Sequence, residues 1–438
     1  MTTSHTLSDF ADLLDDAPPE PTPPGPAGKI VALSFLGVIL LLFAGSGGYV
    51  WWASTAALPA PTVTSKAPAV TPGAAASVPM PAAGAALLRV EGGDAFLGPD
   101  AANVFASTGG DDSRSIASVA KLITALVVLD AHPLASADDP GPTISFTKAD
   151  TDLYDRFYVQ DAVVARMPDG TRMSQHDALA TMLLPSAANY AVALARWGFG
   201  SEGAYVQAAR TWLSANGLTN TRIVDATGLD SRNTSTPSDL LALARLAAAN
   251  PAVAAIAATG SIDVPGPGYV TNTNDLLGTL GITGLKTGNL GDGTFNLLFT
   301  SRLDVGVGTP LRITGVRMGG ETHDSTDDDV RRMLQGVADG FHDVTVGTVG
   351  DTIGSISTPW GAKASLVLAQ TSEVRTWSDT PIAVDLKTTT PQNYADGEVV
   401  GSVSWTAGPR STSSSVKISG AIEEPTLWWR LTHPGELG

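Results

Sequence analysis

The chain of 438 residues contains no cysteine. This absence excludes disulfide bonds, thiolate zinc sites and a cysteine nucleophile. Its six histidines stand at positions 5, 132, 176, 323, 342 and 433, and no pair has a metal-ligand spacing such as HExxH. The sequence therefore predicts neither a catalytic zinc ion nor any other cofactor.

Basic residues are also scarce. The chain has 26 Lys and Arg against 43 Asp and Glu, which gives a formal net charge of -17. Nucleic-acid binding needs clustered basic side chains, so a nucleic-acid partner is excluded, as is broad adhesion to anionic lipid. The acidic balance is that of a chain kept soluble by its charge. At 43% hydrophobic residues, it can still bury a substantial core.

The N-terminal part falls into two segments of opposite character. Residues 1–28 are polar, acidic and rich in proline, which predicts a disordered cytoplasmic tail. Residues 29–53 contain an uncharged apolar run that is long enough to cross a bilayer of ~30 Å as a helix. Lys29 before the run and Trp51 and Trp52 at its end predict a single-pass helix whose N-terminus lies inside.

A cleaved signal peptide is the alternative for this segment. The run from Ala53 to Ala56 has small residues that a signal peptidase could cut. However, the preceding tail is longer and more acidic than a signal peptide requires, and the apolar run is also too long. We therefore expect an uncleaved anchor that holds the rest of the chain at the outer face of the cell membrane.

The remainder of the chain predicts a linker and two folded domains. Residues 54–84 are rich in Ala and Pro and predict a semi-extended linker. Residues 85–342 mix helical and strand patterns and predict an α+β domain, in which an antiparallel sheet is flanked by helices and joined to a helical subdomain. Residues 343–438 show short strands between Gly, Pro, Asn and Asp turns and predict a small all-β domain.

The first candidate for chemistry is the sequence Ser118-Val119-Ala120-Lys121. Positions i and i+3 share one face of a helix, so the Lys121 amine would point at the Ser118 hydroxyl. A serine needs a base to become a nucleophile, and a lysine serves as that base when burial lowers its pKa. The surrounding residues are apolar, and an unpaired charge there would be costly. Ser-x-x-Lys alone is nevertheless a common sequence.

Two further candidates are weaker when each is taken alone. Lys286-Thr287-Gly288 could present an amine, a hydroxyl and an open backbone to a ligand carboxylate, although the same residues form ordinary turns. Ser186 and Asn189 lie in a break between two helical stretches, where such residues also serve as helix caps.

The order of these three elements is the signature of penicillin-binding serine enzymes. The chain resembles the D-alanyl-D-alanine carboxypeptidases of the low-molecular-weight penicillin-binding protein class, which is peptidase family S11. The likeness includes the nucleophile helix at 114–129, the segment DATGLDSRNTSTPSDLLALAR at 225–245 and the third motif, GLKTG. It spans about residues 85–341, and it implies the β-lactamase/DD-peptidase-like fold.

The resemblance implies a role for each candidate residue. Ser118 would attack the carbonyl of a D-Ala-D-Ala bond in a peptidoglycan stem peptide, with Lys121 as general base and Ser186 as proton relay to the leaving amine. Lys286 and Thr287 would bind the terminal carboxylate beside Gly288. The backbone N–H groups of Ser118 and Asn289 would hold the oxyanion, and β-lactam antibiotics would act as inhibitors.

The second motif departs from the family pattern. The family has asparagine two places after serine, where this chain has Ala188, and Asn189 follows one place later. Asn189 is therefore a candidate substrate contact only if the backbone there is irregular. The departure keeps a non-catalytic penicillin-binding scaffold as an alternative.

A class A-like β-lactamase is the other alternative. It would need a deacylating glutamate between the second and third motifs, where Glu202 is the only one. The residues leave open the choice between carboxypeptidase, endopeptidase and transpeptidase.

Overall fold

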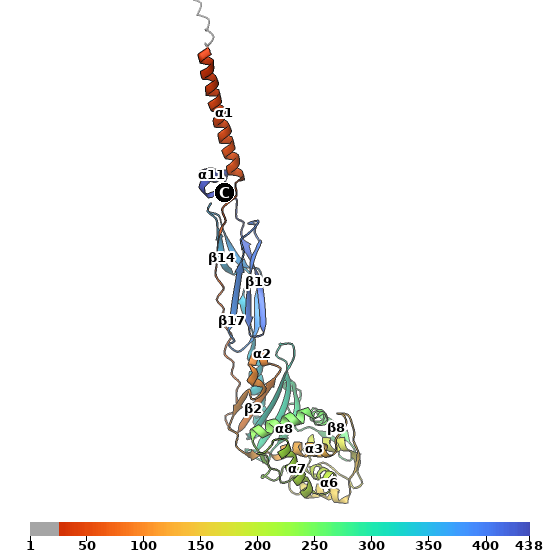
Figure 1. Cartoon of the computed structure of the whole chain (residues 1–438). Coiled ribbons are helices and arrows are strands. Elements are labelled where there is room, and N and C mark those ends of the chain that lie inside the picture. Colours follow the sequence, from red (N-terminus) through yellow and green to blue (C-terminus); the bar gives the residue numbers. More distant parts are fainter. Residues whose placement is uncertain (1–25) are drawn as a thin grey trace, which may run out of the picture.

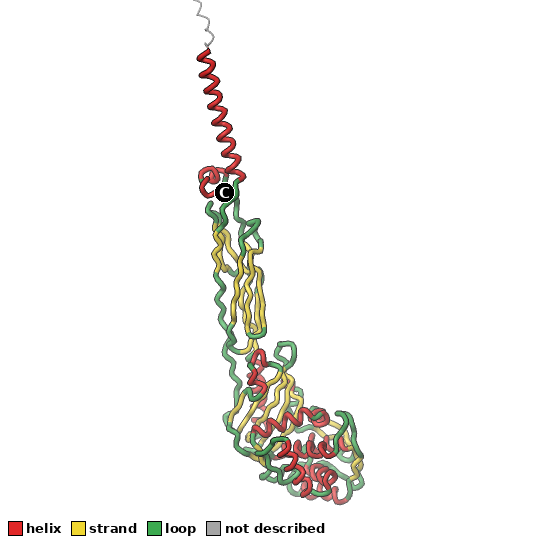
Figure 2. Tube along the Cα trace, in the orientation of Figure 1, coloured by secondary structure: helices red, strands yellow, loops and turns green. Residues whose placement is uncertain are grey.

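The computed structural model of the chain describes residues 26–438, so the predicted tail lies outside the described residues as far as residue 25. The molecule is elongated (Figures 1 and 2), with a long helix at one end, a β-rich region in the middle and a mixed helix-and-sheet domain at the other end. The fold class predicted from the sequence is confirmed.

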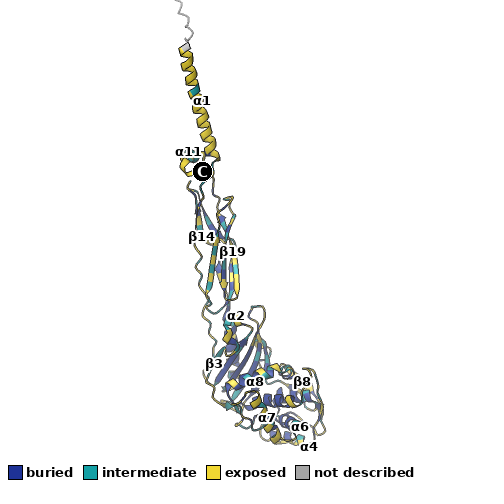
Figure 3. Cartoon of the chain, in the orientation of Figure 1, coloured by how far each residue is buried: buried dark blue, intermediate teal, exposed yellow. Residues whose placement is uncertain are grey.

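Helix α1 (Pro26–Thr55) contains the predicted membrane span and extends it by a few residues at each end. Its apolar side chains contact no core of the described chain, and Leu41 and Phe43 are 73% and 72% exposed (Figure 3). A helix that is apolar on every side and unburied needs an apolar solvent around it. This environment matches the interior of a bilayer, where the backbone hydrogen bonds of a helix are all satisfied internally.

The β-rich region contains a six-stranded antiparallel sheet with the order β1-β14-β15-β19-β18-β17. These strands are β1 (Thr62–Ser65), β14 (Thr352–Ser357), β15 (Lys363–Leu368), β17 (Ile382–Thr388), β18 (Val399–Ala407) and β19 (Arg410–Ser419). Strands β13 (Phe341–Gly347) and β16 (Ser372–Trp377) pair beside it. Alternate residues of β18 and β19, such as Val403, Trp405 and Val416, face a common core.

The segment predicted as a linker does not run free along its whole length. Its residues 62–65 form β1, which pairs with β14 as an edge strand of the sheet. Farther along, the Ala76 N–H donates to Ser378 Oγ at 2.9 Å. The linker therefore runs along the β-rich region toward the large domain (Figure 1). Pairing of β1 with β14 satisfies backbone N–H and C=O groups that would otherwise form hydrogen bonds with water.

The C-terminus returns to the membrane end of the molecule (Figure 1). Helix α11 (Leu427–Thr432) packs against the end of α1. The Tyr49 hydroxyl donates to the Leu431 carbonyl at 2.7 Å, and Arg430 Nη1 donates to the Ala56 carbonyl at 3.0 Å. These contacts fix the β-rich region to the C-terminal end of α1.

The large domain is built on a five-stranded antiparallel sheet with the order β10-β11-β12-β2-β3. Its strands are β2 (Ala85–Glu91), β3 (Ala106–Thr108), β10 (Ile282–Gly288), β11 (Phe295–Leu303) and β12 (Leu311–Gly320). Helix α8 (Pro237–Ala249) packs on the sheet, and helix α10 (His323–Asp339) packs with the core of its other face. The sheet thus presents the end of β10 to the helical subdomain.

The helical subdomain surrounds α3 (Ala120–Ala131), whose residues from Ala120 to Leu129 are all buried (Figure 3). The neighbouring helices are α4 (Lys148–Tyr158), α5 (Gln175–Leu183), α6 (Ala188–Phe199), α7 (Glu202–Ala215) and α9 (Pro251–Ala257), with the short α2 (Asp94–Leu97) beside the sheet. Three two-stranded pairs complete the domain: β4 (Arg114–Ser115) with β7 (Thr234–Ser235), β5 (Thr143–Ser145) with β6 (Arg172–Ser174), and β8 (Ser261–Val264) with β9 (Gly268–Thr271).

Candidate active site

Ser118 lies in a short 3-10 turn (Ala117–Val119) that leads directly into α3, and Lys121 lies in the first turn of α3. Lys121 Nζ is 2.9 Å from Ser118 Oγ and 2.8 Å from the Thr227 carbonyl oxygen. The i, i+3 spacing therefore places the amine against the hydroxyl, as the sequence predicts. Ala117, just before the serine, has a φ of 47°, a left-handed conformation that a non-glycine residue adopts at a cost in energy.

Burial sets the basicity of Lys121. Its side chain is only 1% exposed among apolar neighbours. Loss of water lowers the pKa of Lys121 from 10.5 to about 7, and the negative charge of Asp225 opposes part of this shift. At neutral pH, about half of the amine is therefore unprotonated and able to accept the Ser118 proton.

A loop at residues 225–233 holds the carbonyl that faces Lys121. The Asp225 carboxylate accepts hydrogen bonds from Thr227 N at 2.7 Å, Gly228 N at 2.7 Å and Asn233 Nδ2 at 2.9 Å. These bonds fix the loop and aim the Thr227 carbonyl at Lys121. Reasoning from the sequence did not single out Asp225 or Thr227, although the family-like segment that contains them was the signal that could have identified them.

Gly228 lets this loop approach the nucleophile. Its φ is +82°, and a Cβ placed on it would lie 1.9 Å from the Ala117 carbonyl oxygen. Only glycine combines this conformation with this close backbone contact.

Strand β10 carries the third motif into the same site. Lys286 and Thr287 are buried, and Thr287 Oγ1 lies 2.6 Å from Thr273 Oγ1. Burial, together with the positive charge of Lys121, lowers the pKa of Lys286 well below its usual value. The two amines are thus close enough to repel each other, and an incoming anion would relieve that repulsion.

Gly288 brings β10 against the nucleophile. A Cβ at Gly288 would lie 2.9 Å from the backbone nitrogens of both Ser118 and Val119. Strand β10 is also an edge strand of the described sheet, with β11 as its neighbour. The other edge of β10 is open in that it pairs with no strand within residues 26–438, and an extended peptide could add its own backbone hydrogen bonds there.

The second motif lies at the start of α6. Ser186 has a φ of 68°, and its hydroxyl is buried without a hydrogen-bond partner among residues 26–438. Asn189 is fully buried and uses both ends of its amide on Ala165: Oδ1 accepts from Ala165 N at 3.1 Å, and Nδ2 donates to Ala165 O at 2.8 Å. The Ser186 hydroxyl thus has no partner within the described chain, whereas both ends of the Asn189 amide are used on Ala165, which does not support the predicted substrate contact of Asn189.

The structure brings together Ser118, Lys121, Lys286, Thr287 and Gly288. Asn289 follows β10 directly and is exposed, and the hydrogen bonds of the described chain do not connect its side chain to the site. In the part of the chain that the structure describes, no cluster of three or more His, Asp or Glu side chains could hold a metal ion.

Comparisons with known proteins agree with this geometry. A family model described as D-alanyl-D-alanine carboxypeptidase matches residues 95–307. A D-alanyl-D-alanine endopeptidase of Pseudomonas aeruginosa is 37% identical over 130 residues, which cover 29% of this chain and 38% of the relative. A protein of the same description from Haemophilus influenzae is 28% identical over 204 residues, or 45% of this chain and 66% of the relative.

Two solved structures share the fold. Penicillin-binding protein 5 of Haemophilus influenzae has a TM-score of 0.50 at 18% identity and covers 80% of this chain and 99% of its own. A mutant of the Streptomyces K15 DD-transpeptidase has a TM-score of 0.50 at 23% identity and covers 59% of this chain and 98% of its own. The chain is thus similar to the D-alanyl-D-alanine carboxypeptidase family over residues 95–307, and this matching region contains the paired Ser118 and Lys121.

Proposed function

We propose that this protein is a serine-type D-Ala-D-Ala carboxypeptidase that removes the terminal D-alanine from peptidoglycan stem peptides. The observation that carries the proposal is the 2.9 Å contact between Ser118 Oγ and the Lys121 amine, whose pKa is lowered to about 7, beside the open edge of β10. Acyl transfer to a serine requires a nucleophile and a base, which here are Ser118 and Lys121. Strand β10 could bind the extended peptide that is cleaved.

Acylation would begin when the neutral Lys121 amine takes the Ser118 proton. The Ser118 oxygen then forms a bond to the carbonyl carbon of the penultimate D-alanine, and the developing oxyanion accepts hydrogen bonds from the N–H groups of Ser118 and Asn289. As the peptide bond breaks, the protonated Lys121 passes its proton through Ser186 to the leaving amine and becomes neutral again. Water, deprotonated by Lys121, attacks the ester and returns Ser118 to its starting state. In deacylation, the proton that Lys121 takes from water is returned to the departing Ser118 oxygen.

Lys286 and Thr287 would select a substrate with a free carboxylate. The desolvated Lys286 amine gains most from an anion that enters the site, because a nearby opposite charge raises the pKa that burial has lowered. Thr287 supplies a hydroxyl at the same position, and Gly288 leaves room for the substrate backbone. A β-lactam carries an equivalent carboxylate, which supports the proposal that such antibiotics inhibit the protein.

Endopeptidase activity is the second candidate. The chain spans 38% of the length of the Pseudomonas aeruginosa relative, which is named an endopeptidase. The open β10 edge also suits an extended chain that continues beyond the cleaved bond. A carboxypeptidase releases a single terminal residue, whereas an endopeptidase cuts a bond with more chain on both sides, so substrates that differ only beyond the cleaved bond can separate the two activities.

The full chain in lipid nanodiscs can be incubated with a pentapeptide ending in D-Ala-D-Ala and, separately, with a cross-linked peptide dimer. Chromatography of the products should show release of D-alanine from the pentapeptide, and Ser118→Ala should show none. Cleavage of the dimer alone would replace the proposal with an endopeptidase. Penicillin binding without turnover of either peptide would indicate a scaffold, and rapid hydrolysis of nitrocefin would indicate a β-lactamase.

We also propose the cellular arrangement. Helix α1 anchors the chain, with the segments 29–53, 54–84, 85–342 and 343–438 as span, linker, peptidase domain and β-rich domain, and the last two lie outside the membrane. The proposed boundary at residue 343 falls within β13 (Phe341–Gly347). A protease added to intact cells should digest a C-terminal epitope tag and spare an N-terminal one. The reverse pattern would overturn this topology.

A further inference from the structure

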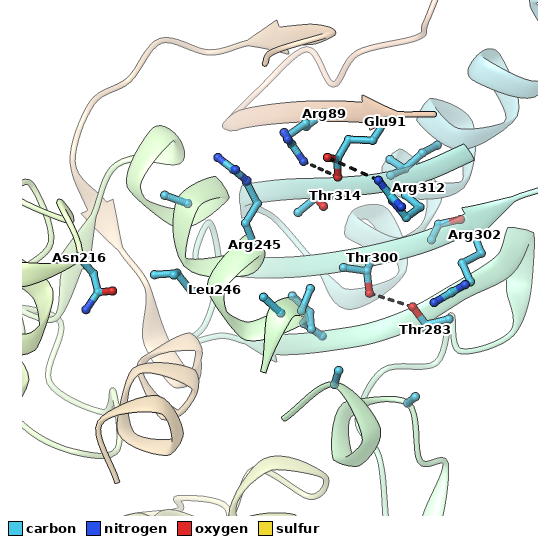
Figure 4. Close-up of a pocket in the computed structure, with 18 residues that line it drawn as sticks. Arg89, Glu91, Asn216, Arg245, Leu246, Thr283, Thr300, Arg302, Arg312 and Thr314 are labelled. Atoms are coloured by element: carbon cyan, nitrogen blue, oxygen red, sulfur yellow. Dashed lines mark hydrogen bonds and ion pairs between the residues drawn. The ribbon is translucent and has the colours of Figure 1, made fainter. Parts of the chain in front are cut away.

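A second cavity lies in the large domain and does not include Ser118. It has a volume of about 860 Å³, within the range of small-molecule sites, and lies between the end of α8 and the sheet strands β2, β12, β11 and β10. Figure 4 shows the side chains that line it, including four arginines: Arg89, Arg245, Arg302 and Arg312. Four of the 26 basic residues of an acidic chain therefore meet at one cavity.

Strand alternation explains why polar side chains gather there. Successive residues of a strand point to opposite faces. The register aligns Glu91, Arg312 and Arg302 in one row across the sheet, and Arg89, Thr314 and Thr300 in the next row.

The residues between these rows point the other way. Val90 and Ile313 belong to the apolar core of the face that also includes α10. The face that carries the two rows is therefore polar by sequence, although it belongs to the central sheet of the domain.

Helix α8 covers only part of this face. Its last turns contribute Ala242, Leu246 and Ala249 to the cavity wall, and the helix ends at Ala249. Beyond that end, Ala254 and Ala258 continue an apolar wall, while Arg302 and Arg312 remain exposed. The cavity therefore has a cationic side formed largely by strands and a small apolar side formed by helices.

The charges of the lining are unbalanced. Glu91 is the only acidic residue of the lining; Arg89 Nη1 pairs with it at 2.5 Å, and Arg312 Nη2 is 3.8 Å away. The side chains of Arg245 and Arg302 form no hydrogen bond or ion pair within residues 26–438, and Figure 4 shows Arg245 extending from α8 toward the side of Arg89. One carboxylate thus faces four guanidinium groups, which leaves an excess of positive charge.

We propose that this cavity binds a small anionic ligand, in which a phosphate or carboxylate group meets Arg245, Arg302 and Arg312 and an uncharged body lies against the alanine and leucine wall. Guanidinium groups match both anions geometrically, because their planar donors can make paired hydrogen bonds. The lining of this cavity includes none of Ser118, Lys121, Lys286, Thr287 and Gly288. The proposed site is therefore separate from the peptidase site.

The test uses three probes of similar shape: phenyl phosphate, benzoate and phenol. Each is titrated by calorimetry into the full chain in nanodiscs made of zwitterionic lipid. At least one of the two anions should bind more tightly than phenol, and the tighter anion identifies the ligand group. Raising the salt concentration should weaken that binding, because exposed charges are screened.

Variants locate the binding. Arg245→Gln and Arg302→Gln should each weaken binding of the tighter anion by about tenfold, as expected for loss of a charge-assisted hydrogen bond. Arg331→Gln is the matched control, because Arg331 is an exposed arginine on α10 that pairs with Asp328. Circular dichroism melts check that every variant is folded.

Several outcomes would overturn the proposal. Equal binding of all three probes would show an apolar pocket without anion selectivity. No detectable binding of either anion at millimolar concentration would show that the excess charge has no ligand of this class. Undiminished binding in both arginine variants would place the anion elsewhere on the protein.

Discussion

The pKa of Lys121 makes a quantitative prediction about the pH dependence of acylation. A lysine in water has a pKa near 10.5, so that only about one amine in 3,000 is neutral at pH 7. Burial lowers the pKa of Lys121 to about 7, which makes about half of the amines neutral at the same pH. The folded protein therefore increases the population of the active base by about a thousandfold at neutral pH.

The sign follows from the role of the base. Acylation needs the unprotonated amine, so the rate should rise with pH and level off above the pKa. Between pH 6 and pH 8, the neutral fraction of a group with a pKa near 7 rises from about one tenth to about nine tenths. On the proposed binding mode, saturating penicillin would keep Lys286 paired with the bound carboxylate, so that the rise of the rate with pH would report on Lys121.

The assay is rapid-quench labelling of the full chain in nanodiscs by a fluorescent penicillin, from pH 5.5 to pH 9 at constant ionic strength. The expected curve has a midpoint near pH 7, and Ser118→Ala provides the unlabelled baseline. A rate that continues to rise up to pH 9, or that falls between pH 6 and pH 8, would refute the assignment of a desolvated Lys121 as the base.

Three other predictions concern stability and geometry. Between pH 7 and pH 10, the free energy of unfolding of the wild type should rise by up to ~1.4 kcal/mol per pH unit relative to that of Lys121→Met, because the folded lysine binds fewer protons than the unfolded one. If the free energies of unfolding of the two proteins change equally with pH, the burial of Lys121 does not lower its pKa. Gly288→Ala should destabilise the domain by ~1–3 kcal/mol and slow penicillin labelling, since the added Cβ would lie 2.9 Å from Ser118 N. Unchanged labelling kinetics would show that β10 does not pack tightly against Ser118. Asn189→Ala should lower the free energy of unfolding by ~1–3 kcal/mol, because the backbone N–H and C=O of Ala165 lose their partners, while turnover per folded molecule changes little. A large loss of turnover at normal stability would indicate that Asn189 contacts the substrate.

The local pattern of apolar residues was sufficient to predict the helix that carries the candidate nucleophile and base, and two strands of the sheet. The apolar run around Ser118 predicted a buried helix, and α3 is that helix, preceded by a 3-10 turn at the serine itself. The alternating sequences LLFTSRL at 297–303 and LRITGVRM at 311–318 also favour strands, and they lie within β11 and β12. These predictions succeeded because the periodicity of buried side chains is a local property of the chain.

Contacts between distant segments could not be derived in the same way. The carbonyl of Thr227 faces Lys121 only because Asp225 folds its loop with hydrogen bonds to backbone groups. The pairing of Asn189 with Ala165 depends on a segment 24 residues earlier in the chain, and no sequence pattern links the two. Likewise, β1 was hidden in a proline-rich segment, because its pairing with β14 is decided by tertiary structure.

The arginine-lined cavity illustrates the same limit. Its four arginines are spread from residue 89 to residue 312 and look like isolated surface charges in the sequence. Only the strand register brings Arg89, Arg302 and Arg312 onto one face of the sheet, where Arg245 joins them from α8.

The most direct test of the central claim is intact-protein mass spectrometry of the full chain after brief exposure to benzylpenicillin, followed by peptide mapping. The account predicts one added penicilloyl group per chain, located on Ser118, and no adduct in Ser118→Ala or at comparable times in Lys121→Met. An adduct on any other residue, or an unmodified Ser118 after prolonged exposure, would contradict the claim that Ser118 and Lys121 form the acylating pair.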